Sequence, residues 1–252
     1  MKMAALIATA VMLLGLGPAT ALAGCKDHAG SGVDWSGCSK KLLMLGSASL
    51  DGAKLDGSNL TSTDLGGANL NGANLDNADL SYTSLKGASL KGASLVKTAG
   101  NRTVLAEADL SDAKMQAIEL FRADLSGANL TKANLSRSSL PRAMFEGANL
   151  SGASLEKSDV IRSNFNDADL TGLDFTYAIV ARASFRNAKL AGSDWTNAYL
   201  YRSNLVGADL SGVKGLTSAQ VAIACGDGTT KLPAGVDAPD PWPCNKQDES
   251  AL

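Results

Sequence analysis

Residues 33–212 repeat every five residues without an insertion. Counting from Trp35, every fifth residue is apolar at 34 of 36 positions, and Lys40 and Gly100 are the two exceptions. Two residues before each of these centres stands a small residue, most often Ala and otherwise usually Ser or Thr. A period this regular requires a repeated architecture in which each unit packs against its neighbours.

A five-residue step fits neither an amphipathic helix nor a plain strand. A helix needs apolar residues three and four apart, and a step of five spreads them around the whole cylinder. The intervening Gly, Asn, Asp and Ser favour turns. A short extended piece followed by a corner does fit, because Ala68 and Leu70 then point the same way and Asn71-Gly72 turns the chain. The sequence therefore predicts a coil with Ala and Leu inside and polar residues outside.

The repeated unit has the form A-[DN]-L-x-x. The copies Ala68-Asn69-Leu70-Asn71-Gly72, Ala78-Asp79-Leu80-Ser81-Tyr82 and Ala128-Asn129-Leu130-Thr131-Lys132 closely resemble the pentapeptide-repeat family. That resemblance implies an all-β fold, a right-handed quadrilateral β-helix with four pentapeptides per coil. Residues 33–212 would then form about nine coils, a rod about 40 Å long at the usual strand spacing.

Residues 1–23 are predicted to be an export signal. Lys2 gives the positive start, residues 4–16 are the apolar core, and Ala21-Leu22-Ala23 is the small-residue cleavage pattern. The apolar run is too short to span a bilayer comfortably, so we expect no transmembrane span after cleavage. The expected location is the periplasm or the medium. An alternative is a lipid anchor on Cys25, because Leu22-Ala23-Gly24-Cys25 resembles a bacterial lipoprotein box.

The four cysteines flank the repeats. In an exported chain an even number predicts disulfides, and the local pairs Cys25–Cys38 and Cys225–Cys244 would each hold one end of the rod. Lipidation of Cys25 would leave Cys38 without its partner. A metal site is not expected, because there is no C-x-x-C motif and His28 is the sole histidine.

Both ends of the repeat carry residues suited to closing it. Trp35 is predicted to plug the first coil, and Thr217-Ser218-Ala219-Gln220 is a capping box that predicts a short helix over Val221 and Ile223. The proline-bearing tail is expected to fold back along the rod and to fray over its last eight residues. The predicted organisation has four parts: an export signal (1–23), a lead-in (24–32), the β-helix (33–212), and a cap helix with its tail (213–252).

Residues 20 apart should stack in columns. Phe145, Phe165 and Phe185 fall in an inward column and are predicted to stack in the core, with Trp195 above Phe175. One outward corner carries arginine in six successive coils and lies beside aromatic residues. This candidate interaction stripe consists of Arg102, Arg122, Arg142, Arg162, Arg182 and Arg202, with Phe121, Tyr199 and Tyr201.

Two interpretations of the arginine column remain open. Neighbouring unit charges at this spacing repel by roughly 1 kcal/mol even in water, so the column needs compensation. In the first interpretation a duplicated unit kept a solvated, salt-bridged column, whose partners would be Asp79, Glu119, Asp159 and Asp124. In the second, the column is a contact surface for a protein, an anionic glycan or a lipid headgroup.

An enzyme is not expected, since the sole histidine lies outside the coil and no catalytic constellation or phosphate-binding loop can be assembled. No cofactor is expected. Some relatives in the family mimic DNA and block a topoisomerase, but that role needs an acidic rod. Residues 33–212 carry 18 Lys and Arg against 19 Asp and Glu, a net charge of −1, and no nucleic-acid partner is expected. We therefore expect a non-catalytic interaction or structural module of the bacterial envelope, whose partner is an unknown protein or an anionic envelope component; glycan binding through the stripe is the first alternative and DNA mimicry the second. The sequence leaves the oligomeric state open.

Overall fold

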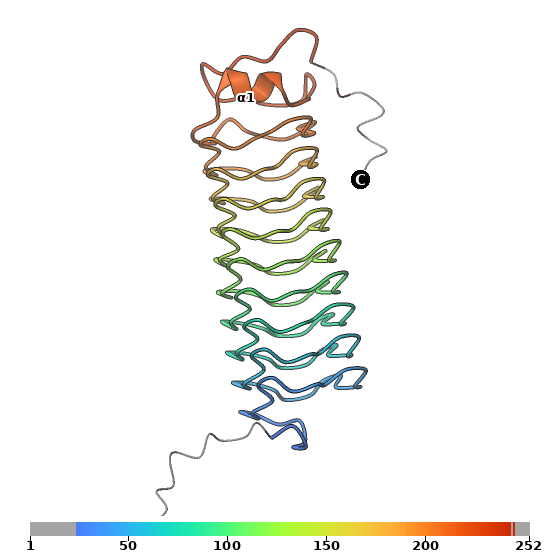
Figure 1. Cartoon of the computed structure of the whole chain (residues 1–252). Helices are drawn as coiled ribbons and strands as arrows, with labels where there is room; N and C mark the ends of the chain where they lie inside the picture. The colour runs from blue at the N-terminus through green and yellow to red at the C-terminus, as the bar shows by residue number, and fades with distance from the viewer. Residues whose placement is uncertain (1–23, 243, 245–252) are drawn as a thin grey trace, which may run out of the picture.

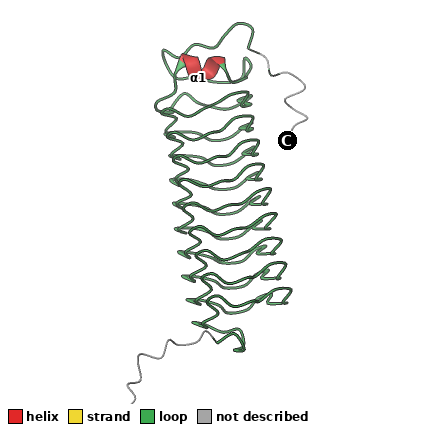
Figure 2. Ribbon diagram, viewed as in Figure 1, coloured by secondary structure: helices red, strands yellow, loops and turns green. Residues whose placement is uncertain are grey.

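The computed structural model describes residues 24–242 and residue 244. The chain winds into a rod of stacked coils, a right-handed quadrilateral β-helix (Figure 1). Helix α1, Ser218–Ala222, lies at the C-terminal end of the rod. Figure 2 draws the coils as loop because their strand positions are single-residue parallel bridges, each between residues 20 apart.

The backbone of each coil is paired to the next. The amide of Leu70 donates to the carbonyl of Ser89 at 2.7 Å, and the amide of Ser89 donates back to the carbonyl of Ala68 at 2.9 Å. Within the coil, the amide of Ala73 donates to the carbonyl of Leu70 at 3.0 Å and closes the corner. The predicted alternation of a short extended piece and a corner is therefore what the hydrogen bonds build.

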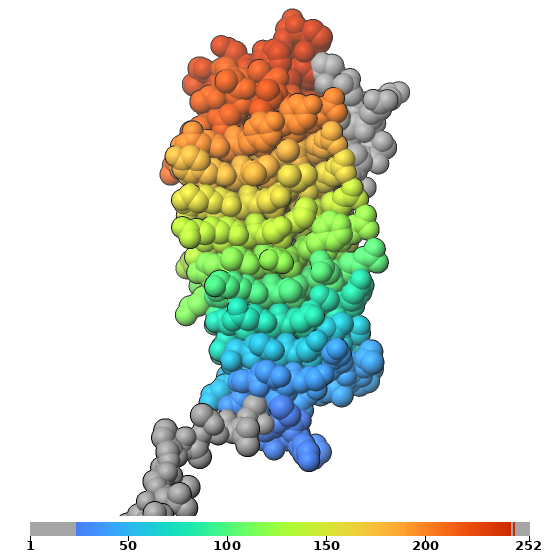
Figure 3. Space-filling model, in the orientation of Figure 1, coloured from blue at the N-terminus to red at the C-terminus, as the bar shows by residue number. Residues whose placement is uncertain are grey.

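The interior consists of the residues that the five-residue period marks. Leu70, Leu90 and Leu110 lie in one internal file, and each is 0% exposed. Each buried leucine contributes about 2 kcal/mol of apolar burial. Figure 3 shows the coils as filled, successive bands without an open bore between them.

Ser and Thr replace Ala at some inward positions without leaving a polar group unpaired. The hydroxyl of Thr83 donates to the carbonyl of Leu60 at 2.7 Å, and the hydroxyl of Ser163 donates to the carbonyl of Leu140 at 2.7 Å. In both pairs the acceptor is the central residue of a pentapeptide in the preceding coil. The small inward column therefore accepts hydroxyls because a carbonyl of the neighbouring coil is always within reach.

The Asn or Asp between the two inward residues binds the corner that follows. Asn69 Oδ1 accepts the amide of Asn71 at 3.2 Å, and Asp194 Oδ1 accepts the amide of Thr196 at 2.9 Å. This local bond stabilises the turn, which explains why the repeat prefers a short polar residue there.

These turn bonds lower the pKa of several aspartates. Hydrogen bonds from Thr171, Thr196 and Ser211 lower the pKa of Asp169, Asp194 and Asp209, in the last case to about 2 with the help of Lys231. Because the folded pKa lies below the unfolded value of about 3.9, the contribution to stability is complete above that pH and is lost as the pH falls toward 2.

We therefore expect the melting temperature of the rod to be constant near neutral pH and to fall between about pH 4 and pH 2. The triple variant Asp169→Asn, Asp194→Asn and Asp209→Asn should lose less of its melting temperature over this range, because Asn69 shows that asparagine forms the same turn bond. Circular dichroism melts at several pH values measure this. An equally steep fall in the variant would contradict the assignment.

The aromatic core forms as predicted. Phe165 stacks on Phe145 with ring centroids 4.7 Å apart and planes at 3°, and on Phe185 at 5.1 Å and 1°. Phe175 and Trp195 lie 4.6 Å apart at a tilt of 37°. All five rings are 0% exposed. The wider rings fill the C-terminal half of the interior in place of leucine.

The two exceptions to the apolar period have separate explanations. The Lys40 ammonium lies 3.7 Å from the centroid of the Trp35 ring, and Trp35 is 1% exposed beneath it. Burial lowers the pKa of Lys40, although the charge of Asp27 opposes this shift. At Gly100 an added Cβ would lie 2.6 Å from Leu120 Cδ2, so the leucine of the next coil fills the space.

Both ends of the rod carry the disulfides expected from the sequence. Cys25 is bonded to Cys38, and Cys225 is bonded to Cys244. Cys225 also pairs with the last coil as a parallel bridge to Asn204. The expectations for residues 1–23 and 245–252 fall outside the described part of the chain.

Helix α1 begins at the predicted capping box. Thr217 Oγ1 accepts the amide of Gln220, and the Gln220 side chain accepts the amide of Thr217. Gln220 Nε2 also donates to the carbonyls of Trp195 and Ala198, at 2.8 and 2.9 Å. Val221 is buried as expected, but the prediction for Ile223 was wrong: it is the C-cap and is 38% exposed, because α1 ends at Ala222.

Candidate functional site

The six arginines of the predicted column form the arginine stripe. Each occupies the second position of a corner, two residues after an inward centre, and each has a positive φ between 54° and 60°. Neighbouring members are one coil apart, about 4.8 Å at the usual strand spacing. Arg102, Arg122 and Arg142 are exposed, and Arg162 and Arg182 are half-buried.

The stripe places side chains where the backbone favours glycine. At the corner after Leu50, Leu70 and Leu90 the equivalent position is glycine, with φ of 62° to 64°. A residue with a Cβ pays roughly 1–2 kcal/mol in this left-handed region. The arginine corner has no glycine at this position in any coil of the described rod. Strain that is repeated at one corner is an observation that points to a use for the side chains.

The five arginines from Arg102 to Arg182 have no ion-pair partner in the part of the chain that the structure describes. Elsewhere on the rod, lysines do pair: Lys86 Nζ lies 3.4 Å from Glu107, and Lys157 Nζ lies 2.6 Å from Glu156. None of the five guanidinium groups lies within 4.0 Å of a described carboxylate. The salt-bridged interpretation of the column is therefore not what the structure contains.

The acidic residues that could have neutralised the stripe bind the backbone of the corners instead. Asp124 Oδ1 accepts the amide of Ser126 at 3.0 Å, and Asp159 Oδ1 accepts the amide of Ile161 at 2.9 Å. Asp79 accepts the amide of Ser81 at 2.9 Å. Burial acts to raise the pKa of Asp79, but the bonds from Ser81 and Thr61 outweigh it, so the net shift is downward.

Aromatic residues lie at both ends of the stripe. Phe121 is 40% exposed, with the Arg122 guanidinium carbon 5.2 Å from its ring centroid. Tyr201 is 39% exposed, with the Arg202 guanidinium carbon 5.4 Å away. Tyr199 and Tyr201 stack with centroids 6.2 Å apart and planes at 12°. The structure thus brings together the stripe and its three predicted aromatic neighbours on one side of the rod.

A shallow cavity of about 400 Å³ lies in the middle of the stripe. Arg122, Arg142 and Arg162 border it, with Met144 and Asn164 beside them. Met144 is 43% exposed, so the cavity offers both positive charge and an apolar surface. The sequence predicted the column but not this cavity, because its shape depends on how long arginine side chains lie against the neighbouring face.

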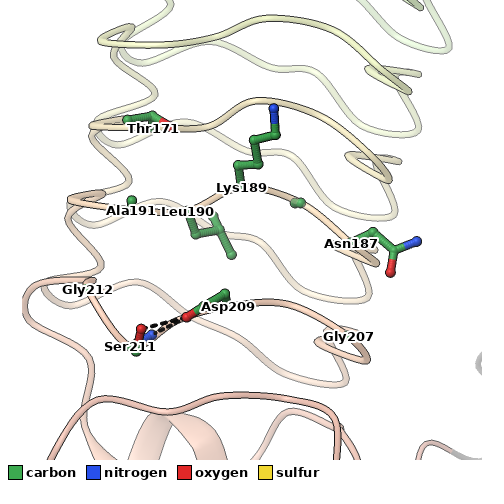
Figure 4. A pocket seen from close by; sticks show the side chains of 10 residues that line it. Thr171, Asn187, Lys189, Leu190, Ala191, Gly207, Asp209, Ser211 and Gly212 are labelled. Atoms are coloured by element: carbon green, nitrogen blue, oxygen red, sulfur yellow. Dashed lines mark hydrogen bonds between the residues drawn. The ribbon is translucent and has the colours of Figure 1, made fainter.

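A second cavity, of about 520 Å³, lies on another face near the C-terminal end (Figure 4). Lys189 and Asp209 lie on its wall, and both are already engaged. Lys189 Nζ lies 3.9 Å from Asp169, while Asp209 accepts Ser211 at 2.6 Å and Lys231 at 2.9 Å. Its charges are paired within the protein, so it is a weaker candidate for a binding site than the stripe.

The described residues contain no group of three or more His, Cys, Asp or Glu that could hold a metal ion. Over the same residues, no helix is long and apolar enough to cross a membrane.

Comparison with known families agrees with this geometry. A profile described as pentapeptide repeats matches residues 45–81, 83–117 and 118–156 in eight copies. A second profile, described as a pentapeptide repeat region, matches residues 138–214. The chain belongs to the pentapeptide-repeat family. None of the curated proteins compared with it matches this pentapeptide-repeat protein.

Solved structures include similar rods. HetL, a pentapeptide repeat protein involved in heterocyst differentiation regulation from the cyanobacterium Nostoc sp. strain PCC 7120, is 26% identical with a TM-score of 0.59, over 78% of this chain and 90% of its own. QnrB1, a plasmid-mediated fluoroquinolone resistance protein, is 20% identical with a TM-score of 0.43, over 75% and 94%. Rfr23 from the cyanobacterium Cyanothece 51142 is 32% identical over 36% and 58%, with a TM-score of 0.28.

Proposed function

We propose that this pentapeptide-repeat protein is a non-catalytic, exported rod of the bacterial envelope that presents the arginine stripe to a partner. The observation that supports the proposal is the line of five arginines without an ion-pair partner among the described residues. Buried or surface charges usually find partners when partners are near, and here the nearby carboxylates bind corner amides instead. The partner is an anionic envelope component or a protein with an acidic surface.

The choice between a binding role and a purely structural role depends on the cost of the stripe. Like charges one coil apart repel by roughly 1 kcal/mol per pair in water, and the left-handed corner adds strain. A spacer rod gains nothing from either term. DNA mimicry is disfavoured because the repeats carry a net charge of only −1.

The proposal also covers the ends and the export of the rod. Residues 1–23 direct export, about nine coils form the rod, and α1 covers the last coil through Gln220. The disulfide at Cys25 favours simple cleavage over a lipid on that residue. Mass spectrometry of the mature protein tests this: an N-terminus at Gly24 with both cysteine pairs oxidised is expected, and a lipid-modified Cys25 would contradict it.

Cosedimentation with isolated bacterial cell envelopes tests the binding role. The wild-type protein should sediment with the envelopes, and the stripe variant, Arg122→Gln with Arg142→Gln and Arg162→Gln, should remain in the supernatant. Glutamine keeps a Cβ at the corner, so the backbone strain is unchanged. The matched control removes three lysines from other faces: Lys91→Gln, Lys114→Gln and Lys132→Gln. Equal sedimentation of the stripe variant and the wild type, with the fold intact by circular dichroism, would remove the stripe as the contact surface.

A further inference from the structure

We propose that the arginine stripe binds a linear acidic polysaccharide, a polyuronate with one carboxylate on each sugar, laid along the rod axis. The inference rests on the proposed function and names the partner class of the same surface. It follows from three properties of the stripe: its spacing, its straightness, and the mixture of charge and aromatic surface around it.

The spacing is the first property. The guanidinium groups repeat once per coil, about 4.8 Å, because each coil pairs with the next at the strand distance. A pyranose ring linked across its ring advances a glycan by about the height of one coil. Successive uronates can therefore meet successive arginines without the two series drifting out of register. The guanidinium fork suits a carboxylate, which it can bind through two parallel hydrogen bonds.

Other linear polyanions fit less well. An extended acidic peptide places side chains on one side only every second residue, roughly 6.6 Å apart, so its carboxylates fall out of step with the coils. Duplex DNA carries its phosphates around a helix, and the rod offers it a single basic corner and a formal net charge of −2. A membrane surface is disfavoured because acidic residues flank the corner; Glu119, for example, is exposed on the adjoining face.

The surface beside the stripe is the second line of support. Aromatic rings can pack against the apolar faces of sugar rings, and Phe121, Tyr199 and Tyr201 are all about two-fifths to one-half exposed. Between these aromatic ends, the cavity of about 400 Å³ combines three arginines with the exposed thioether of Met144 and the amide of Asn164. A pocket with charged, polar and apolar walls offers contacts to the carboxylate, the hydroxyl groups and the ring of a sugar.

The test is isothermal titration calorimetry of the full mature chain with oligogalacturonates of two, four and six sugars at low ionic strength. Each exposed guanidinium–carboxylate pair changes an equilibrium by a few fold, so affinity should increase with each step in length. The stripe variant should bind the six-sugar oligomer on the order of tenfold more weakly. The lysine control should bind as the wild type does.

Three further arms fix what each outcome means. The variant with lysine at positions 122, 142 and 162 keeps the charge and loses the fork, so intermediate affinity supports the proposal. A reduced, neutral oligomer of the same sugar should not bind. Absence of oligogalacturonate binding, an affinity that does not increase beyond two sugars, or equal binding of duplex DNA would overturn the polyuronate assignment. If envelope sedimentation still depends on the stripe in that case, the proposed function stands and this inference alone falls.

Discussion

The variant Phe165→Ala should lose about 3–5 kcal/mol of unfolding free energy, the range for removing a buried phenylalanine. Phe165 is 0% exposed and lies between two parallel rings, at 4.7 Å from Phe145 and 5.1 Å from Phe185. Alanine would leave a void at the centre of the stack, and the neighbouring coils are fixed by backbone pairing and cannot close it. Urea denaturation followed by circular dichroism measures the loss.

Two controls give this prediction its meaning. Phe121→Ala removes the same side chain from a position that is 40% exposed, and its effect on stability should be within about 0.5 kcal/mol. Phe165→Leu restores the residue type most common at inward centres and should cost less than the alanine variant. A Phe165→Ala protein as stable as Phe121→Ala would mean that the aromatic column does not support the rod.

The five-residue period was sufficient to predict the core. The inward position of Leu70, the stacking of Phe165 and the burial of Trp35 all follow from the period, because a closed coil leaves each residue only one side to face. The local turn chemistry is equally readable, since Asn69 and Asp194 act within two residues of their own position. Information of this kind is short in range and repeated many times.

What the sequence did not predict depends on longer side chains and on the ends. The period places arginine at a corner, but whether a guanidinium meets Asp124 or Asp159 depends on three-dimensional reach and on competing turn bonds. The exposure of Ile223 depends on where α1 stops, which one capping box does not determine. The opening near Lys189 is a local property of two adjoining coils that share the same repeat as all others.

The stripe and the core pose different demands on the same repeat. Inside, each coil must present the same small and large apolar residues, and substitution there affects stability. At the corner, glycine would satisfy the backbone, as it does at Gly72, while arginine adds strain and repulsion. Removing stripe arginines should therefore reduce binding and leave stability unchanged or slightly increased, which separates function from fold in this rod.

Removal of the C-terminal disulfide should open the end of the rod and leave its middle intact. Cys225 and Cys244 close a loop with a sequence separation of 19, for which the loss of cross-linking costs about 3 kcal/mol. The same segment pairs with the last coil: the amide of Leu205 donates to the carbonyl of Cys225, and the amide of Leu210 donates to Lys231, both at 2.8 Å. In a solenoid each coil depends on its nearest neighbours, so the effect should be local.

Hydrogen exchange of the Cys225→Ser, Cys244→Ser variant measures this directly. The amides of Leu205 and Leu210 should lose protection by on the order of a hundredfold, since about 3 kcal/mol corresponds to that ratio. The amide of Leu110, which donates to Asn129 in the middle of the rod, should exchange as in the wild type and is the internal control. Unchanged protection at Leu205 would show that α1 and Gln220 hold the end without the disulfide. Equal loss at Leu110 would instead mean that the rod unfolds as one cooperative unit, contrary to nearest-neighbour stability.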